Sequence, residues 1–335
     1  MGGVSGSGIL ADILLSWNFA PPSAVLESVI HLEIIAGTTD FYLERATAAA
    51  IGKFDGLHIG HRRLLEEILA RKKDGMAACV FTFEPAPAVL FGTSDGKELT
   101  TREEKRLMLE RLGVDILIEF PLTWETAAME PEVFAKEMLA QRLQVRYLAA
   151  GSDLSFGSRG KGDASLLQRM APELGFSVEI IDKVCVEGHQ VSSTCVREQV
   201  EAGNMELAGR LLGMPYMMAG QVVTGNRLGR TLGFPTVNVL PGERKLLPPR
   251  GVYFSRVRCR GKLYRAISNV GYKPTVTEER VMGVESYLYD FDQDAYGEPV
   301  EIYFLAFRRP ERQFDNVEAL KNQLQEDIAA GAEYL

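Results

Sequence analysis

Two histidines spaced three positions apart are the strongest chemical signal in this sequence of 335 residues. His58 and His61 follow a short apolar run at 48–51, and glycines stand at 52, 56 and 60. The run predicts a buried strand that ends in a tight turn, with the histidines opening the next helix. Backbone N–H groups at a helix N-terminus attract phosphate, and imidazoles beside them can donate to phosphoryl oxygens. Metal binding or helix capping is the simpler alternative, but the paired histidines and glycines favour nucleotide chemistry.

A second pattern that suits phosphate begins at Ser193. The hydroxyls of Ser193 and Thr194 can cap a helix and hold phosphate oxygens, and Arg197, one turn later, adds a bidentate donor. Alone, this pattern indicates an ordinary helix cap with a surface arginine. Its position downstream of the two histidines favours a second nucleotide-binding element.

A glycine-rich loop leads into a polar strand in the second half of the chain. Gly225, Gly229 and Gly233 are spaced by four, so the loop could wrap phosphates, although it lacks the ending of a Walker A motif. Thr236 and Asn238 alternate on one strand face and offer neutral oxygens, which suit a Mg²⁺ that stays partly bound to phosphate. From spacing alone, a glycine-rich hairpin with a polar strand is the simpler interpretation.

The elements that must position these groups divide the chain in two. Apolar runs at 48–51, 76–83, 115–120, 146–150 and 176–181 predict strands, and the patterns at 60–73, 101–112 and 131–143 predict helices between them. This alternation predicts an α/β domain of Rossmann-like type, with a parallel sheet covered by helices on both faces.

The pattern changes near residue 212. Short alternating stretches from 217 to 307, punctuated by glycine and proline, predict a small antiparallel β-barrel, and 316–330 predicts a closing helix. We therefore expect an N-terminal appendage at 1–31, which we expect to be disordered, a first domain at 32–204 and a second at 205–335.

Composition excludes several classes of protein. Hydrophobic residues make up 46% and charged residues 24%, which is typical of a globular protein rather than a disordered chain. No apolar run is long enough to span a membrane, and four scattered cysteines without metal spacing are typical of a reducing cytoplasm. A net charge of −8 argues against binding to nucleic acid or to a membrane surface.

The segment 225–265 is basic, unlike the chain as a whole, with ten basic residues and one acid. We interpret its alternating Arg256, Arg258 and Arg260 as a solvated face of a sheet.

The motifs of the first half resemble a known family. Residues 52–61 are similar to the HxGH signature of nucleotidyltransferases, and the longer FDGxHxGH form resembles the adenylyltransferase half of bacterial FAD synthetases. Residues 83–87, 101–105, 112–115, 151–163 and 192–197 resemble further motifs of that family in the same order. Two positions depart from it: Ala86 replaces a usual histidine, and Cys195 stands where a basic residue is common.

The motifs of the second half resemble riboflavin kinases. Residues 225–238 are similar to the GR.LGFPTAN signature, with Val237 for alanine, and 250–253, 268–275 and 284–297 resemble later motifs. Tyr287 replaces a frequent histidine, and Gln313 replaces a lysine in the motif at 309–314. Glu285 matches the catalytic base of that family, a role in which its carboxylate would accept the proton of an attacking hydroxyl.

The resemblance implies a set of site residues. The residues expected to act in catalysis are His58, His61 and Glu285. Those expected to bind nucleotide are Phe54, Asp55, Gly56, Gly60, Ser193, Thr194, Arg197, Gly225, Gly229 and Gly233. Those expected to bind flavin are Asp153, Phe156, Gly157 and Arg309, and those expected to bind Mg²⁺ are Thr236 and Asn238.

The implied protein is a bifunctional enzyme of the cytoplasm that uses ATP and Mg²⁺ twice. It would convert riboflavin to FMN and then FMN to FAD, without nucleic-acid or membrane partners. Ala86 and Cys195 motivate an alternative, a riboflavin kinase whose first domain is impaired in adenylyl transfer. A flavin-sensing module that binds RNA or protein is a third hypothesis, supported only by the basic segment.

Overall fold

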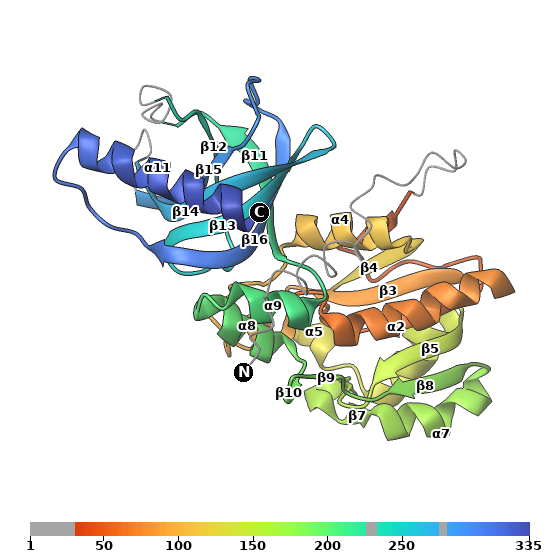
Figure 1. The fold of residues 1–335 in the computed structure, drawn as a ribbon. Coiled ribbons are helices and arrows are strands. Elements are labelled where there is room, and N and C mark those ends of the chain that lie inside the picture. The colour runs from red at the N-terminus through yellow and green to blue at the C-terminus, as the bar shows by residue number, and fades with distance from the viewer. Residues whose placement is uncertain (1–30, 226–232, 275–279) are drawn as a thin grey trace, which may run out of the picture. The chain divides into compact units, whose positions relative to one another are not determined.

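The protein is described here by a computed structural model that covers residues 31–225, 233–274 and 280–335. These residues form two compact units, the first at 31–192 and the second at 193–335 (Figure 1). The second unit thus begins before the domain boundary expected at 204/205. Gly229 and nearly all of the expected N-terminal appendage lie outside the described residues.

A parallel sheet forms the centre of the first unit. Its strands among the described residues are β1 (Glu33–Ala36), β2 (Thr47–Ile51), β3 (Ala77–Glu84), β4 (Ile116–Pro121), β5 (Val145–Gly151) and β8 (Ser177–Ile181). They lie in the order β1-β4-β3-β2-β5-β8, and every neighbouring pair is parallel. All five residues of β2 are buried, which explains the apolar run from Ala48 to Ile51.

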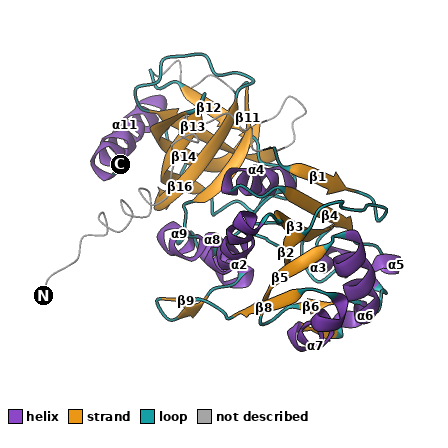
Figure 2. Cartoon of the chain, turned by 90° about the vertical axis from the view of Figure 1, so that its right-hand side faces the viewer, coloured by secondary structure: helices purple, strands orange, loops and turns teal. Residues whose placement is uncertain are grey.

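Helices cover both faces of this sheet, as the sequence predicts. They are α2 (Ile59–Ala70) with the 3₁₀ turn Arg71–Asp74, α3 (Pro87–Leu90), α4 (Arg102–Leu112), α5 (Trp124–Ala127), α6 (Pro131–Val133) with the π-helix Phe134–Arg142, and α7 (Ala164–Leu174). Phe134 and Leu139 pack in one core cluster with Ile51, Phe81 and Ile118 of the sheet. Figure 2 shows α2 and α4 on the opposite side from α6 and α7.

Local signals explain how α4 begins and ends. The Thr101 hydroxyl accepts from the backbone N–H of Glu104, whose carboxylate accepts from the Thr101 N–H in return, and Gly113 ends the helix in a left-handed conformation.

The sequence does not predict β1, α7 or two short hairpins. One hairpin consists of β6 (Ser155–Phe156) and β7 (Gly162–Asp163), and the other consists of β9 (Cys185–Val186) and β10 (His189–Gln190). β1 forms an edge of the sheet and the hairpin strands have two residues each, so their patterns are weak, whereas α7 contains Pro172, a residue that usually interrupts a helix.

The second unit contains the expected antiparallel barrel. Two helices, α8 (Ser193–Glu201) and α9 (Met205–Leu212), precede the strands β11 (Tyr216–Val223), β12 (Thr236–Val239), β13 (Gly251–Cys259), β14 (Lys262–Pro274), β15 (Arg280–Leu288) and β16 (Pro299–Pro310). The barrel closes in the order β11-β12-β15-β14-β13-β16, and α11 (Val317–Tyr334) follows. Closure removes the free edges of the sheet.

Hydroxyl groups bridge three strands inside the barrel. Ser255, Ser268 and Ser286 are fully buried, and their Oγ atoms are linked by two hydrogen bonds of 2.7 Å each. Because a buried hydroxyl is costly without a partner, this chain of hydrogen bonds favours one register of β13, β14 and β15. All four cysteines lie within the described residues, and none of them forms a disulfide there. No described helix is long and apolar enough to cross a membrane.

Candidate active sites

The two predicted histidines lie at the carboxyl edge of the parallel sheet, where the strand order reverses. The chain proceeds from β2 to β3 and β4 on one side, whereas β5 and β8 lie on the other side of β2. Ligands of open α/β sheets bind in the crevice outside such a point. The segment after β2 contains His58, and the segment after β5 contains Asp153, so topology brings these two candidates to the same crevice.

The loop between β2 and α2 has an unusual backbone. Phe54 and Leu57 have φ values of 49° and 45°, in the left-handed region that non-glycine residues rarely occupy, and Gly56 lies between them at 86°. The Phe54 and Leu57 side chains are completely buried, which holds the backbone in this conformation. Thr100 holds the loop from the side, since its Oγ1 accepts from the Gly56 N–H (2.9 Å) and its own N–H donates to Asp55 Oδ1 (3.1 Å).

His58 and His61 form a stacked, buried pair. His58 is the N-cap of α2, and its Nδ1 accepts a hydrogen bond of 3.3 Å from the His61 backbone N–H. The two ring centroids are 3.7 Å apart with planes inclined by 12°, and Phe54 packs against His61 at 5.1 Å. Because Nδ1 of His58 accepts, the proton of its neutral ring is assigned to Nε2, where it can be donated to a ligand.

Burial controls the charge of both rings. Burial lowers the pKa of His58 to about 4, although its own backbone and Asp153 act in the opposite direction. Burial also lowers the pKa of His61 well below its usual value, and electrostatic interactions with His58 and Lys105 lower it further. Both imidazoles are therefore neutral at neutral pH before an anionic ligand enters, and each offers one N–H donor.

The remaining nucleotide-site predictions of this loop have visible structural roles. Phe54 is a core residue, and Asp55 and Gly56 are bonded to Thr100. A Cβ at Gly60 would lie 3.2 Å from the His58 ring, so glycine keeps the space beside that ring open. Contact of these residues with nucleotide stays a prediction.

The predicted flavin residues after β5 differ in environment. Asp153 is exposed and forms an ion pair of 3.1 Å with Lys183. Phe156 is buried and packs on Phe134 with ring centroids 5.6 Å apart, so it belongs to the core. A Cβ at Gly157 would lie 2.7 Å from Pro131, which explains the glycine. Their contact with flavin stays a prediction.

Sequence reasoning missed an aromatic pair in the first unit. Phe91 and Trp124 are 48% and 69% exposed, and their rings meet edge to face with centroids 5.5 Å apart. They follow β3 and β4, so they lie toward the same carboxyl edge as His58. Exposed aromatic side chains can stack on a flat ring. Their separation of 33 residues in the sequence hides the pair.

The predicted phosphate motif at Ser193 opens a helix, as expected. Ser193 and Thr194 form the first turn of α8, and Arg197 lies one turn later. The helix packs on α9, and its Val196 and Val200 are buried. These residues belong to the second unit, and their joint action with the histidines stays a prediction.

A second polar cluster lies on the barrel around Glu285. Glu285 of β15 is paired with Asn238 of β12 on one side and with Asn269 of β14 on the other. The Thr236 hydroxyl donates to Glu285 Oε1 at 2.6 Å. Alternation along adjacent antiparallel strands thus gathers a carboxylate, a hydroxyl and two amides. The sequence predicts three of these residues and misses Asn269.

The glycine loop reaches this cluster at its first glycine. A Cβ at Gly225 would lie 2.4 Å from Asn238 Nδ2, so only glycine allows the backbone to approach the amide so closely. Gly233 has a φ of 88° and open space around it. The intervening residues 226–232, which include Gly229, lie outside the described residues.

Glu285 lines a cavity of about 270 Å³ on the barrel. Part of its lining is polar and includes the neighbouring residues Thr236, Asn269 and Glu285. Apolar side chains line other parts of the cavity, from the barrel (Val252, Ile267) and from α11 (Leu320, Leu324, Ile328). The α11 residues were not predicted as site residues, although their spacing by four places them on one helix face.

A buried ion pair joins α11 to the barrel beside this cavity. Asp327 of α11 is 1% exposed, and both its oxygens accept from Arg309 of β16, the shortest contact being 2.6 Å to Nη2. Gln323 also donates to Asp327 at 3.2 Å. Arg309 lines the cavity as its predicted flavin role requires, but its guanidinium is already held in a fixed plane by Asp327.

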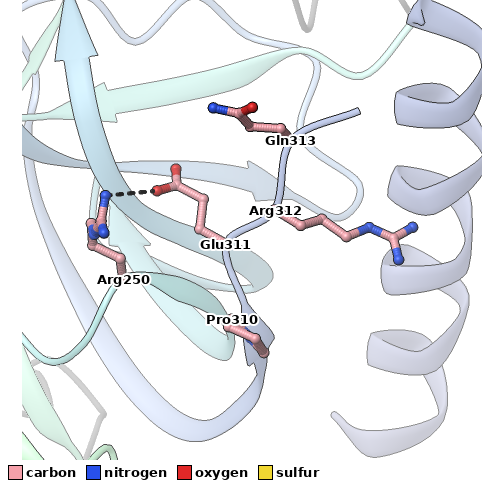
Figure 3. Close-up of a pocket in the computed structure, with 5 residues that line it drawn as sticks. All are labelled: Arg250, Pro310, Glu311, Arg312 and Gln313. Atoms are coloured by element: carbon pink, nitrogen blue, oxygen red, sulfur yellow. Dashed lines mark ion pairs between the residues drawn. The ribbon is translucent and has the colours of Figure 1, made fainter. Parts of the chain in front are cut away.

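A second, more open cavity of about 660 Å³ lies at the end of β16. It is lined by Arg250, Pro310, Glu311, Arg312 and Gln313 (Figure 3). Arg250 and Glu311 form an ion pair of 3.9 Å across it, whereas Arg312 points toward α11. Glu311 and Arg312 line both cavities, so this segment separates them.

The basic segment is less solvated than expected. Arg258 is largely buried and lies 3.7 Å from Glu301, and Arg260 pairs with Glu298 at 2.9 Å. Half-buried Arg256 has its pKa lowered by burial and by Arg265. Acids that are distant in sequence therefore neutralise much of the alternating arginine face.

Both halves of the chain match known protein families. The family model of FAD synthetase matches residues 42–195, and that of riboflavin kinase matches residues 212–335. A bifunctional riboflavin kinase/FMN adenylyltransferase of Listeria monocytogenes is 35% identical over 87% of this chain and 93% of its own length. Its counterpart from Escherichia coli (strain K12) is 37% identical over 85% and 91%, respectively.

A solved structure shares the arrangement of elements. The crystal structure of a protein from Streptococcus pneumoniae, described as a macrolide-efflux protein, aligns with a TM-score of 0.79 and 30% identity. It covers 90% of this chain and 98% of that protein.

Proposed function

This chain belongs to the family of bifunctional riboflavin kinase/FMN adenylyltransferases, and we propose that it converts riboflavin to FMN and FMN to FAD, consuming ATP in both steps. The observation that carries the proposal is that each matched segment contains its own polar site. One surrounds His58 and His61, and the other surrounds Glu285.

Both activities are favoured over the kinase-only alternative. Each family model matches its half, and the similar curated proteins are bifunctional by name. The two departures do not remove the histidine pair: Ala86 precedes the short helix α3, and Cys195 lies in the first turn of α8.

In adenylyl transfer, the first unit would hold ATP at the N-terminus of α2. An oxygen of the FMN phosphate attacks the α-phosphorus of ATP, the bond to the β-phosphate breaks, and pyrophosphate leaves. His58 Nε2–H and the imidazole of His61 would donate to phosphoryl oxygens as negative charge moves toward the leaving group. Because both rings are buried and neutral beforehand, they are already oriented when ATP binds.

The exposed pair Phe91–Trp124 suits the flavin of this step. An isoalloxazine ring is flat and largely apolar, and a half-exposed aromatic pair at the carboxyl edge offers it a stacking surface. Asp153 and Lys183 would then lie on the other side of the switch point, after β5.

In the kinase step, Glu285 would act as the general base. Its carboxylate accepts the proton of the terminal ribityl hydroxyl while that oxygen attacks the γ-phosphorus of ATP and ADP leaves. The Thr236 hydroxyl fixes one carboxylate oxygen at 2.6 Å, which orients the base. The apolar side chains that line the cavity from the barrel and α11 would contact the isoalloxazine ring, and the polar residues around Glu285 would contact the ribityl chain.

The donor set beside Glu285 fits Mg²⁺ that arrives with ATP. Thr236 donates its proton to Glu285, so its lone pairs remain available, and Asn238 adds an amide oxygen. No cluster of three or more metal-binding His, Cys, Asp or Glu side chains occurs in the described part of the chain. Thr236 and Asn238 would hold the ion together with phosphate oxygens, and the ion would neutralise charge on the phosphates.

A single assay tests the proposal. Purified full-length protein is incubated with riboflavin, ATP and Mg²⁺, and then with FMN in place of riboflavin, and the flavins are separated by chromatography. We expect FMN with ADP from the first mixture, followed by FAD, and FAD with pyrophosphate from the second. Formation of FMN without FAD in either mixture would establish the kinase-only alternative.

A further inference from the structure

A lysine outside the predicted site holds the loop that leads to the histidines. Lys105 of α4 donates from Nζ to the backbone carbonyl of Lys53 at 3.2 Å. The Thr82 hydroxyl of β3 donates to the same carbonyl, also at 3.2 Å. Lys53 directly precedes Phe54, the first residue with a left-handed backbone. The two donors therefore fix the peptide plane at which the loop turns toward His58.

The helix that carries Lys105 is firmly attached to the sheet. Glu119 of β4 is 2% exposed and accepts from Arg102 and Arg106 at distances down to 2.5 Å. These arginines hold the pKa of Glu119 below its usual range against the effect of burial. Arg102 and Arg106 lie on the same helix as Lys105. Their hydrogen bonds to Glu119 therefore hold the part of the backbone from which the Lys105 side chain extends.

The charge of Lys105 also acts on His61. It acts on His61 strongly enough to contribute to the lowered pKa of that ring, after burial and His58. Lys105 is half-buried and forms no ion pair with any described residue. An unneutralised ammonium that holds the loop before His58 and acts on His61 suits a site that must receive a polyanion.

We propose that Lys105 is a positioning residue for adenylyl transfer: it fixes the loop that presents His58 and His61, and it keeps a positive charge beside His61 for the triphosphate. This inference rests on the proposed function of the first unit. It adds a residue from α4 to a site otherwise built from the turn after β2 and the segment after β5.

The test compares three substitutions in the full-length chain. Lys105→Arg keeps the charge and a donor, Lys105→Gln keeps a donor without the charge, and Lys105→Met removes both. We expect kcat/KM for FAD formation from FMN to fall by about tenfold in Lys105→Gln and further in Lys105→Met, with Lys105→Arg close to the parent. Conversion of riboflavin to FMN by the same samples is an internal control and should not change.

A matched control is available at the other end of the sheet. Lys72 also donates to a backbone carbonyl, that of Gly113 at 2.9 Å, but it lies beside Asp115 before β4 begins. Lys72→Gln should leave FAD formation unchanged. The inference is overturned if Lys105→Gln and Lys105→Met retain the parent rate, or if Lys72→Gln loses as much.

Histidine titration by NMR provides a readout independent of turnover. The chain has four histidines, so variants of His58 and His61 assign their signals. Loss of the lysine charge should move the His61 titration toward higher pH in Lys105→Gln and Lys105→Met, but not in Lys105→Arg. An unchanged titration overturns the inference, even if the parent protein makes no FAD and the proposed function fails.

Discussion

Replacing His58 should separate its two roles, capping and phosphate binding. His58→Asn keeps a side-chain acceptor at the N-cap of α2 but removes the imidazole, whereas His58→Ala removes both. Both variants lose the stacking on His61, in which the ring centroids are 3.7 Å apart. The difference between the two variants therefore isolates the cap.

The structure sets the size of both effects. The capping hydrogen bond from the His61 N–H is long at 3.3 Å, so we expect His58→Ala to be less stable than His58→Asn by about 0.5–1 kcal/mol. Loss of one buried donor to the charge of a transition state costs roughly a hundredfold to a thousandfold in rate. Both variants should lose FAD formation by about this factor.

Urea unfolding and the two-step flavin assay measure these quantities. FMN formation from riboflavin should stay at the parent level, because Glu285 lies in the other unit. FAD formation by His58→Asn at the parent rate would refute the assigned donor role. Equal stability of the two variants would refute the capping role.

Further predictions concern pH, the kinase base and the helix α11. Burial holds the pKa of His58 at about 4, below the usual value of 6.5, so the unfolded chain binds more protons between these values. Stability should thus fall by about 2 kcal/mol from this group between pH 7 and pH 5, and urea titrations of His58→Asn should show a weaker pH dependence. Thr236→Val should lower kcat for riboflavin phosphorylation by about tenfold, while Thr236→Ser, which keeps the hydroxyl, should remain close to the parent in the same assay. Asp327→Ala leaves Arg309 without its buried partner and should destabilise the second unit by about 3 kcal/mol in calorimetry. Asp290→Asn, which removes the charge of an exposed pair with Arg265 and still tolerates the left-handed backbone at this position, should cost less than about 1 kcal/mol, and equal losses would contradict this reasoning.

Sequence reasoning succeeded where neighbouring residues determine the structure. The apolar run before Gly52 predicts β2, and the Thr101 and Gly113 signals predict the limits of α4. The alternation of Thr236 and Asn238 predicts a strand with its polar residues on one face, and β12 is that strand. Motif order also indicated the family, which the comparisons confirmed.

Other features depend on contacts between distant segments. The cavity beside Glu285 acquires part of its apolar lining from α11, and Asp327 binds Arg309 across 18 residues. The ring of Phe91 packs against that of Trp124, and Lys105 donates a hydrogen bond to the carbonyl of Lys53, 52 residues earlier in the sequence. No local pattern in the sequence indicates that the two members of each pair are in contact.

The sequence by itself determined the parallel α/β domain, the barrel, the family and the chemical types of the site residues. These follow from periodicity, turn residues and motif order, which are local properties of the chain. Only the tertiary structure decided that His58 and His61 are stacked and neutral and that Lys105 holds their loop. Burial and long-range hydrogen bonds arise when distant segments pack together, and they set the charge and orientation of side chains whose identity the sequence already fixes.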